Sequence, residues 1–293
     1  GWLLGLAIFN LCAVGALFVP RSRRRNSVPW LLFAVSVLAS ELAWIWLPLQ
    51  AALAFAFSLG GALGSPVGQG ALLALLISWP VLLWSVVTGI AAGTPVERAL
   101  QAGLGENYRD AVPARLREGW RSKLRFSDWR NPGAFAPSDV EVIRGVPYGP
   151  SGIRQQLDIY RPRSIPPGGC PVLLQIHGGA WIIGDKAQQA LPLMHHLARR
   201  GWICVAANYR LSPSVGFPVH LEDCKRALCW IRTKGAEYGM DTRFVAVTGG
   251  SAGGHLAALM GLTENRPELQ PDHPGVDTSV QACVPFYGVY DFL

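Results

Sequence analysis

The feature that most constrains this chain is a glycine-rich pentapeptide set between two apolar runs. Gly249-Gly250-Ser251-Ala252-Gly253 follows a β-branched run at residues 245–248 and opens an apolar run of helical length at residues 252–262. This order predicts a strand, a sharp turn and a helix, with the Ser251 hydroxyl exposed at the carboxyl end of a sheet. Glycine is needed beside the serine because side chains there would collide in so tight a turn. We therefore predict Ser251 as a catalytic nucleophile.

A second glycine-rich segment ends the apolar run at residues 171–176. Its sequence is His177-Gly178-Gly179-Ala180-Trp181. In acyl-transfer enzymes a loop of this kind donates backbone N–H groups to the anionic oxygen of the tetrahedral intermediate. The expected donors are Gly178 and Gly179, joined by the N–H of Ala252. A glycine turn that only reverses the chain is the alternative, and the serine turn about seventy residues later favours an oxyanion loop.

Four motifs occur in order along the second half of the chain. They are His177-Gly178-Gly179-Ala180-Trp181, Asn208-Tyr209-Arg210-Leu211-Ser212-Pro213, Phe217-Pro218 with Leu221-Glu222-Asp223, and Gly249-Gly250-Ser251-Ala252-Gly253-Gly254-His255. Together they resemble the hormone-sensitive-lipase-like branch of the α/β-hydrolase esterases, close to bacterial carboxylesterases, over residues 138–293. The resemblance implies hydrolysis of carboxylic esters by a serine nucleophile, with no metal and no organic cofactor.

Two positions depart from the pattern of that family. Ala180 stands where many members have a third glycine, and Gly250 stands where many have Asp. Neither change removes a backbone donor, so we expect the chemistry to survive both.

The resemblance also assigns supporting roles. The supporting residues of the two glycine-rich turns are His177, Ala180, Gly249 and Gly253. Trp181 and Phe217 are candidates for lining the acyl pocket, although both are also ordinary core residues. Tyr209, Arg210 and Asp223 are expected to brace loops near the site.

The general base is missing from its expected place. In this fold the chain order is serine, then acid, then histidine, and only His255 and His273 follow Ser251. His255 lies on the helix that carries the serine, too close to swing over its hydroxyl, and His273 lies in a loop. Asp291 matches a structural position of the family. We therefore expect the triad acid and histidine beyond Leu293, a domain truncated at its C-terminus, and a fragment that is inactive or nearly so.

Residues 1–93 predict a membrane region. The chain is 50% hydrophobic with a mean hydropathy of +0.25, more apolar than an ordinary soluble protein. Apolar runs cover residues 2–19, 30–59 and 70–92, and Glu41 is the only charged residue between positions 26 and 94. We expect three transmembrane helices, with Glu41 at a packing or interfacial position.

Basic residues set the expected topology. Arginines occupy positions 21 and 23–25 and recur between positions 98 and 130, so three spans place both basic segments in the cytoplasm, as the positive-inside rule requires. The multi-pass membrane protein then has a cytoplasmic catalytic domain. If Pro48 divides the second apolar stretch into two spans, the catalytic domain lies outside, but that alternative breaks the charge rule. Residues 94–137 are expected to form a basic juxtamembrane linker near the membrane surface.

Residues 138–293 are expected to begin an α/β-hydrolase catalytic domain. Strands are predicted at residues 140–146, 155–160, 172–176, 203–207, 244–248 and 282–286, and helices at residues 188–200, 220–234 and 252–262. Two strands followed by strand–helix alternation indicate an α/β fold, with a mostly parallel sheet and helices on both faces.

Several classes of partner are not predicted. None of the six cysteines forms a C-x-x-C pair, so we expect no metal site and interpret the cysteines as buried free thiols. Nucleic-acid modules are not indicated, since the basic charge of the first 130 residues accompanies apolar spans and fits lipid headgroups. The expected partners are a small-molecule or lipid-like ester substrate and membrane lipids.

Two other functions remain open for the same fold. One is a non-catalytic membrane-tethered scaffold with a degenerate hydrolase domain, which the intact serine turn and oxyanion loop argue against. The other is a serine acyltransferase or peptidase that uses the same chemistry on a different acceptor or substrate.

Overall fold

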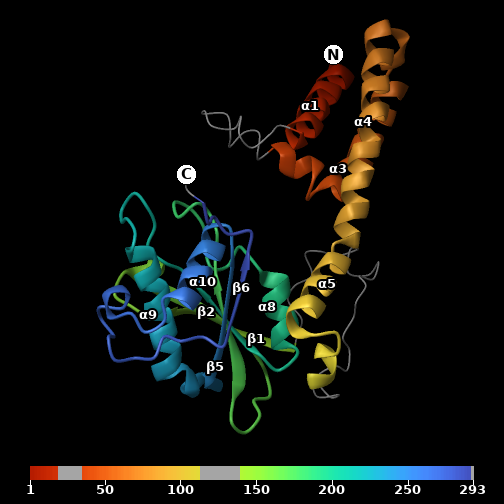
Figure 1. Ribbon diagram of the computed structural model, residues 1–293. Coiled ribbons are helices and arrows are strands. Elements are labelled where there is room, and N and C mark those ends of the chain that lie inside the picture. Colours follow the sequence, from red (N-terminus) through yellow and green to blue (C-terminus); the bar gives the residue numbers. More distant parts are fainter. Residues whose placement is uncertain (19–34, 113–138, 292–293) are drawn as a thin grey trace. The chain divides into compact units, whose positions relative to one another are not determined.

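The computed structural model describes residues 1–18, 35–112 and 139–291 (Figure 1). The chain divides into two compact units, Gly1–Leu124 and Arg125–Leu293, which we call the helical unit and the sheet unit and describe separately. Three predicted features lie outside the described residues: the arginines at positions 21–25, the start of the second apolar stretch, and most of the juxtamembrane linker with its boundary near residue 137.

The helical unit consists of helices packed through small side chains. It contains α1 (Trp2–Leu17), α3 (Ala43–Leu59), η2 (Ala62–Gly64), α4 (Pro66–Ala91), α5 (Gly93–Leu104) and η3 (Tyr108–Ala111). Buried alanines, among them Ala7, Ala13, Ala54 and Ala71, form its two apolar clusters with Leu75 and Leu82. Small residues at such contacts let helix backbones approach closely.

The lengths of the described helices do not match those expected for three transmembrane helices. The continuous run Pro66–Leu104 is, among the described residues, the one helix long and apolar enough to cross a membrane by length and composition. Helices α1 and α3 are apolar but have 16 and 17 residues, fewer than the roughly 20 that a span usually needs. The multi-pass arrangement therefore stays a prediction.

The second apolar stretch is divided, but not at Pro48. The chain turns at residues 40–42, where Glu41 is exposed, and Pro48 lies inside α3. The alternative in which Pro48 divides this stretch does not match α3, because a proline in an apolar helix removes one hydrogen bond without having to end the helix.

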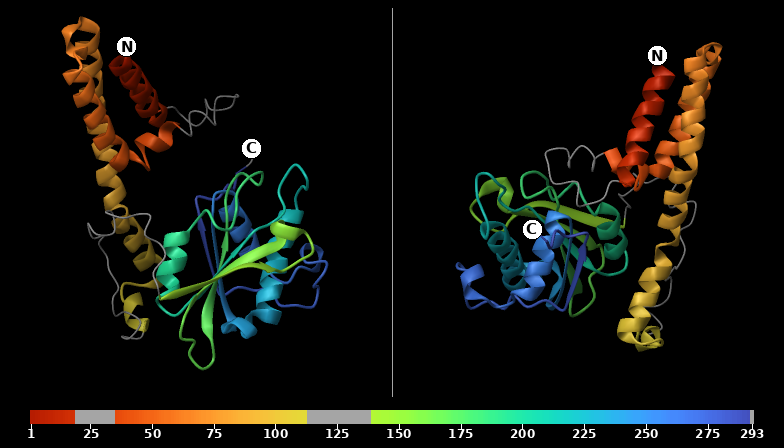
Figure 2. Two further views of the ribbon diagram at one scale, coloured as in Figure 1. Left: turned by 180° about the vertical axis from the view of Figure 1, so that it is seen from behind. Right: turned by 45° about the horizontal axis from the view of Figure 1, so that its top comes forward.

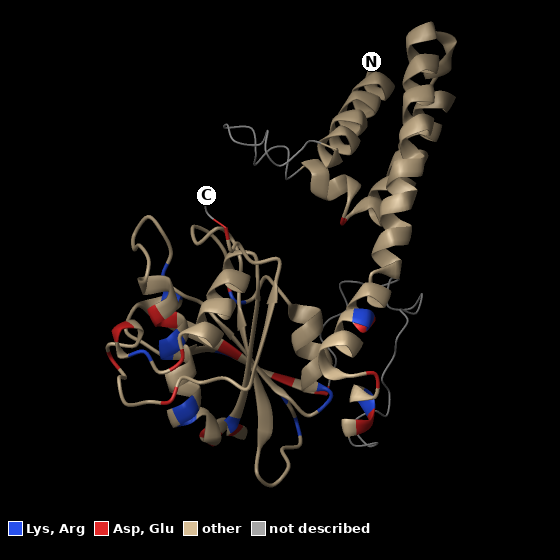
Figure 3. Cartoon of the chain, in the orientation of Figure 1, with Lys and Arg blue, Asp and Glu red and all other residues tan. Residues whose placement is uncertain are grey.

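The helical unit buries polar side chains and exposes apolar ones. Asn10, Gln50 and Ser78 are almost completely buried, whereas Phe55 and Ile77 are each 67% exposed. Within the described part of this unit, charged side chains lie on α5 and η3 and at the loop positions Glu41 and Glu106, and α1, α3 and α4 carry none (Figure 3).

The sheet unit has one six-stranded sheet in the order β1-β2-β4-β3-β5-β6. Its strands are β1 (Val140–Pro147), β2 (Gln156–Pro162), β3 (Cys170–Ile176), β4 (Ile203–Ala207), β5 (Met240–Gly250) and β6 (Ala282–Phe286). The pairs β1–β2 and β2–β4 are antiparallel, and β4, β3, β5 and β6 pair in parallel. The predicted α/β-hydrolase fold is confirmed as a mixed, mostly parallel sheet.

Helices cover both faces of this sheet (Figures 1 and 2). The helical elements are η4 (Gly152–Gln155), α8 (Leu191–Ala198), α9 (Val219–Lys234), η5 (Gly235–Tyr238), α10 (Ala252–Leu262) and η6 (Pro267–Leu269). Successive strand residues point to opposite faces, so β3 packs Leu173 with Met194 of α8 and Leu174 with Leu228 of α9 and Leu256 of α10.

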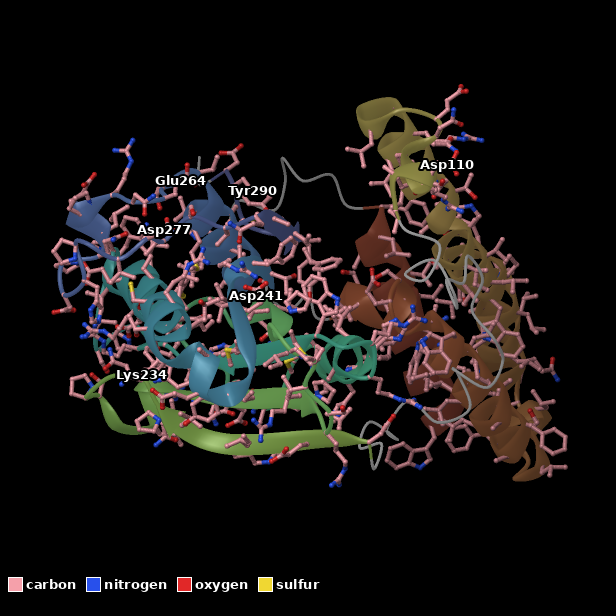
Figure 4. The ribbon with its side chains drawn as sticks, turned by 90° about the horizontal axis from the view of Figure 1, so that it is seen from below. Asp110, Lys234, Asp241, Glu264, Asp277 and Tyr290 are labelled. Atoms are coloured by element: carbon pink, nitrogen blue, oxygen red, sulfur yellow. The ribbon has the colours of Figure 1, made fainter. Side chains whose placement is uncertain are left out.

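The sheet unit has an ordinary polar surface and a mostly buried set of thiols. Charged side chains such as Lys234 and Asp277 are exposed (Figure 4). All six cysteines are free, and four are buried, but Cys12 and Cys283 are exposed. The prediction of burial was wrong for Cys283 because its strand, β6, is an edge strand of the described sheet and has a neighbour on one side.

Candidate active site

Ser251 occupies the turn between the end of β5 and the start of α10. Its backbone has φ 55° and ψ −119°, a conformation that costs a residue with a side chain about 1–3 kcal/mol. The Ser251 N–H donates to the carbonyl of Phe286 at 3.0 Å, which fixes the turn to the end of β6. The predicted strand, sharp turn and helix are therefore present.

Close backbone contacts explain the glycines of the serine turn. A Cβ atom at Gly249 would meet the carbonyl oxygens of Gly253 and Ile176, and a Cβ atom at Gly253 would meet those of Ile176 and His177. These neighbours are backbone atoms, which no rotation of a side chain can move. Glycine is thus required at both positions by packing against the end of β3.

The oxyanion loop, residues 177–181, lies directly against the serine turn. The parallel register pairs Ile176 at the end of β3 with Gly249 near the end of β5. A Cβ atom at Gly178 would stand 2.6 Å from the carbonyl oxygen of Gly250 and 3.3 Å from Cβ of Ser251. Sheet register therefore brings together two segments that are far apart in the sequence.

The three predicted backbone donors are not equivalent in this structure. The N–H of Gly178 donates to Oε1 of Gln189 at 2.7 Å, so in this structure that donor is already engaged. Ala252 is the first residue of α10, and a first helical N–H has no intrahelical acceptor. The structure records no acceptor for the N–H of Gly179 among the residues it describes. The engaged N–H of Gly178 differs from the expected arrangement, and the assignment of oxyanion donors among Gly178, Gly179 and Ala252 stays a prediction.

Two residues of the oxyanion loop take left-handed backbone conformations without being glycine. Ala180 has φ 52° and Trp181 has φ 61°. Left-handed φ costs a residue with a Cβ atom about 1 kcal/mol, which explains why a glycine suits position 180. Ala180 keeps its N–H, as expected.

The two candidate pocket residues have different surroundings. The Trp181 indole packs edge-to-face on the ring of His255, with centroids 5.4 Å apart, and contacts the main apolar core. Phe217 is 64% exposed. Trp181 therefore has a packing role, and pocket lining by either residue stays a prediction.

His177 is a buried structural residue of the oxyanion loop. Its ring stacks on Tyr209 at 4.4 Å, and Nδ1 lies 2.8 Å from the carbonyl oxygen of Gly178. A carbonyl can only accept, so Nδ1 carries the proton and donates. Burial lowers the pKa of His177, so the ring is neutral at pH 7. The Tyr209 hydroxyl donates to the carbonyl of His177 at 2.9 Å. This bond ties the oxyanion loop to the segment that follows β4.

Three other histidines, His195, His220 and His255, lie at packed positions in or beside helices. His255 lies one turn along α10 from Ser251 and faces Trp181. Nε2 of His220 lies 3.2 Å from Oγ of Ser212, and His195 belongs to α8. Burial lowers the pKa of each of these three imidazoles. The triad acid and histidine stay a prediction for the chain beyond Leu293.

Asp223 anchors the loop after β4, in keeping with the bracing role predicted for it. Nε and Nη2 of Arg210 donate to its two carboxylate oxygens at 2.8 and 2.7 Å, and the Arg210 N–H donates at 2.9 Å. Gln155 adds a further bond to Oδ1 at 2.7 Å. Such a bidentate arginine–carboxylate pair is both strong and directional.

Sequence reasoning missed the polar residues that support the oxyanion loop from the following segment. Gln189 binds the Gly178 N–H, and the buried Asn208 binds backbone and side-chain groups of residues 185 and 186. The run Gly184-Asp185-Lys186 indicates a turn, but nothing in the sequence identifies its partners. Within the described ranges, no group of three His, Cys, Asp or Glu side chains is placed to hold a metal ion.

Comparison with known proteins agrees with this geometry. Residues 157–293 match the protein-family model described as BD-FAE. The probable carboxylic ester hydrolase LipM of Mycobacterium tuberculosis is 44% identical over 228 residues, which are 74% of this chain and 52% of LipM. Esterase LipQ of the same organism is 52% identical over 147 residues, 50% of this chain and 35% of LipQ.

A solved structure is also similar. Esterase B from Lactobacillus rhamnosis (HN001) is 28% identical with a TM-score of 0.43, covering 66% of this chain and 56% of that one. The chain spans about half the length of LipM and about a third of LipQ. The sheet order and the strained serine turn fit the α/β-hydrolase fold, and over residues 157–293 the chain is similar to the BD-FAE family model and to the Lip esterases.

Proposed function

We propose that the whole protein is a membrane-anchored serine carboxylesterase or lipase that hydrolyses carboxylic esters through an acyl-enzyme on Ser251. The observation that carries this proposal is the strained backbone of Ser251, held against a glycine-rich loop at the carboxyl end of the sheet. A conformation of this cost persists where the surrounding structure enforces it, and such strain clusters at active sites. The similarity to LipM and LipQ supports the same reaction class.

In the proposed reaction, Oγ of Ser251 attacks the ester carbonyl carbon and its proton passes to a general base. The carbonyl oxygen becomes anionic and accepts hydrogen bonds from the N–H groups of Gly179 and Ala252. Collapse of this intermediate breaks the bond to the alcohol, which leaves with the proton. Water then attacks the acyl-enzyme by the same route. The base in such a reaction is a histidine held by an Asp or Glu.

Apolar side chains beside the loop support an apolar acyl group. Ile182 and Ile183 are 57% and 68% exposed, and Cγ1 of Ile183 would stand 3.2 Å from a Cβ atom at Gly179. Exposed aliphatic surface next to a proposed oxyanion donor favours an acyl chain over a polar substituent. A series of p-nitrophenyl esters with acyl chains of increasing length measures this preference.

The membrane anchor rests on the distribution of side chains in the helical unit. Its buried polar residues and exposed apolar ones suit a surrounding of lipid, and the run Pro66–Leu104 is long enough to span. The catalytic domain is proposed to be cytoplasmic from the positions of the basic residues. Protease added to intact cells is expected to leave the catalytic domain uncut; cleavage without lysis would contradict that side.

The test of the nucleophile uses a fluorophosphonate probe on the whole protein in its membrane. The wild type should be labelled and should hydrolyse p-nitrophenyl butyrate. Ser251→Ala should lose labelling and at least about 10³-fold in kcat, whereas Ser214→Ala, an exposed serine in a loop, should behave as wild type. Labelling that persists in Ser251→Ala would disprove the assignment.

The same experiment separates the other functions. A wild-type protein that is neither labelled nor active on esters favours the scaffold. A labelled protein that cleaves peptides, or transfers its acyl group to an added alcohol faster than to water, favours the peptidase or acyltransferase.

A further inference from the structure

The engaged N–H of Gly178 leads to a role for Gln189. The bond from Gly178 to Oε1 of Gln189 is 2.7 Å long. It fixes the peptide group between residues 177 and 178, and therefore the direction of the next peptide group, whose N–H belongs to Gly179. A Cβ atom at Gly178 would also meet the carbonyl oxygen of Gly250 and Cβ of Ser251. The peptide is thus confined by the serine turn as well as by Gln189.

Gln189 belongs to residues 184–190, which we call the bracing loop. This loop is tied to the sheet unit at three backbone or side-chain points. Nη1 of Arg154 donates to the carbonyl of Gly184 at 3.0 Å, the Lys186 N–H donates to Oδ1 of Asn208 at 2.6 Å, and Nδ2 of Asn208 donates to Oδ2 of Asp185 at 3.0 Å. Because Asn208 follows β4 directly, the bracing loop is fixed relative to the sheet.

A buried ion pair adds a fourth attachment. Nζ of Lys186 lies 3.1 Å from Oδ1 of Asp158 on β2, and the two side chains are 9% and 1% exposed. Asp158 also accepts a bond from the N–H of Gly145 at 2.8 Å. A buried charged pair is strongly disfavoured when either member is left alone, so the loop that carries Gln189 has little freedom to move.

We infer that Gln189 is a positioning residue that aims the N–H of Gly179 at the oxyanion. This inference rests on the proposed esterase function. In this proposal the Gly178 N–H does not contact the substrate. Its hydrogen bond to Gln189 holds the oxyanion loop in a fixed position relative to the bracing loop. A displacement of about 1 Å at a catalytic group is enough to lower a rate by about 100-fold, and removal of the Gln189 acceptor frees the Gly178 peptide to turn.

The test compares Gln189→Met with Gln188→Leu in the whole membrane protein. Methionine keeps the length of the side chain but offers no oxygen to the Gly178 N–H. Gln188 is its exposed neighbour and serves as the matched control. We measure kcat and KM for p-nitrophenyl butyrate, the rate of fluorophosphonate labelling, and the final fraction of protein labelled.

Gln189→Met should lower kcat and the labelling rate by about 10- to 100-fold, with KM within about twofold of wild type and the final labelled fraction unchanged. Gln188→Leu should match wild type in every measurement. A reduced labelled fraction at an unchanged rate would show that Gln189 serves folding alone, and wild-type kinetics in Gln189→Met would overturn the inference. A wild-type protein without labelling or hydrolysis would instead disprove the proposed function.

Discussion

The two units of this protein differ in the kinds of side chain that they expose. In the sheet unit, Leu174 and Val247 are fully buried, and charged residues such as Lys234 and Glu237 lie at the surface. In the helical unit, Asn10 and Gln50 are fully buried, while Ile77 is largely exposed. Because burial of apolar groups is favourable in water, this difference supports the proposal that lipid surrounds the helical unit.

The polar interior of the helical unit is well satisfied. Asn10 donates to Oγ of Ser78 at 2.6 Å and accepts from Nε2 of Gln50 at 2.6 Å and Nε1 of Trp46 at 3.1 Å. Trp79 donates to Gln50 at 3.1 Å. These bonds join α1, α3 and α4 and add to the apolar contacts between these helices.

The largest expected difference between the units comes from two helical glycines. A Cβ atom at Gly253 would run into the carbonyl oxygens of Ile176 and His177, whereas one at Gly15 meets nothing within 4 Å. Gly253→Ala should destabilise the sheet unit by about 3 kcal/mol or more and abolish labelling. Gly15→Ala should be neutral or stabilising by up to about 1 kcal/mol. Hydrogen exchange resolved by unit measures both, and equal effects would break the comparison.

The second-largest expected difference comes from replacing one exposed isoleucine in each unit by lysine. Ile77 lies inside α4 at 67% exposure, and Ile153 lies in η4 at 62%. A lysine near the centre of a span costs about 2.5–3.5 kcal/mol on insertion, but a lysine at a wet surface changes stability by less than about 0.5 kcal/mol. Ile77→Lys should therefore reduce the fraction of protein that resists alkaline extraction from membranes, and Ile153→Lys should not. Equal extraction of the two variants would argue against the anchor.

Two buried asparagines offer a finer comparison. Asn10 and Asn208 are both fully buried and each makes three side-chain hydrogen bonds. Asn208→Leu should cost about 1–3 kcal/mol by leaving partners unsatisfied and should slow fluorophosphonate labelling, because it releases the bracing loop. Asn10→Leu should cost less, about 0.6–2 kcal/mol, and should leave the labelling rate unchanged. Slower labelling in Asn10→Leu would show that the units are coupled.

The smallest predicted difference is the response to pH. All six histidines lie between positions 177 and 273, and the helical unit has none. Burial lowers the pKa of His177, His195, His220 and His255, so the unfolded chain binds more protons than the folded one below about pH 6.5. The free energy of unfolding of the sheet unit should fall slightly as pH drops from 7.5 to 5.5, because each such histidine is protonated more readily in the unfolded chain than in the folded one. Amide protection factors, which are corrected for the intrinsic pH dependence of exchange, should fall in the sheet unit alone; protection that rises on acidification would contradict the sign.

Much of the sheet unit followed from local patterns. Every predicted strand is present, and the helices at residues 220–234 and 252–262 agree with α9 and α10 within one residue. Helix α8 begins later than predicted, at Leu191, after Ala190 in a left-handed conformation. That boundary depends on the chain around it, because the polar residues before it are held in the bracing loop instead of joining the helix.

The sequence by itself determined the features that depend on neighbours along the chain. The apolar first third, the strand–turn–helix around Ser251 and the glycine-rich loop at residues 177–181 are all legible from composition, periodicity and glycine placement. Each results from the conformational preferences of a short segment.

Only the tertiary structure decided which of those groups are available for chemistry. Gly178 meets Gln189 eleven positions away, Lys186 meets Asp158 across twenty-eight, and Asn10 meets Ser78 across sixty-eight. A hydrogen bond between such distant residues depends on how helices and strands pack, and no local preference encodes it. For that reason the sequence predicted the glycine-rich loop at residues 177–181, while only the fold showed that the N–H of Gly178 is engaged by Gln189.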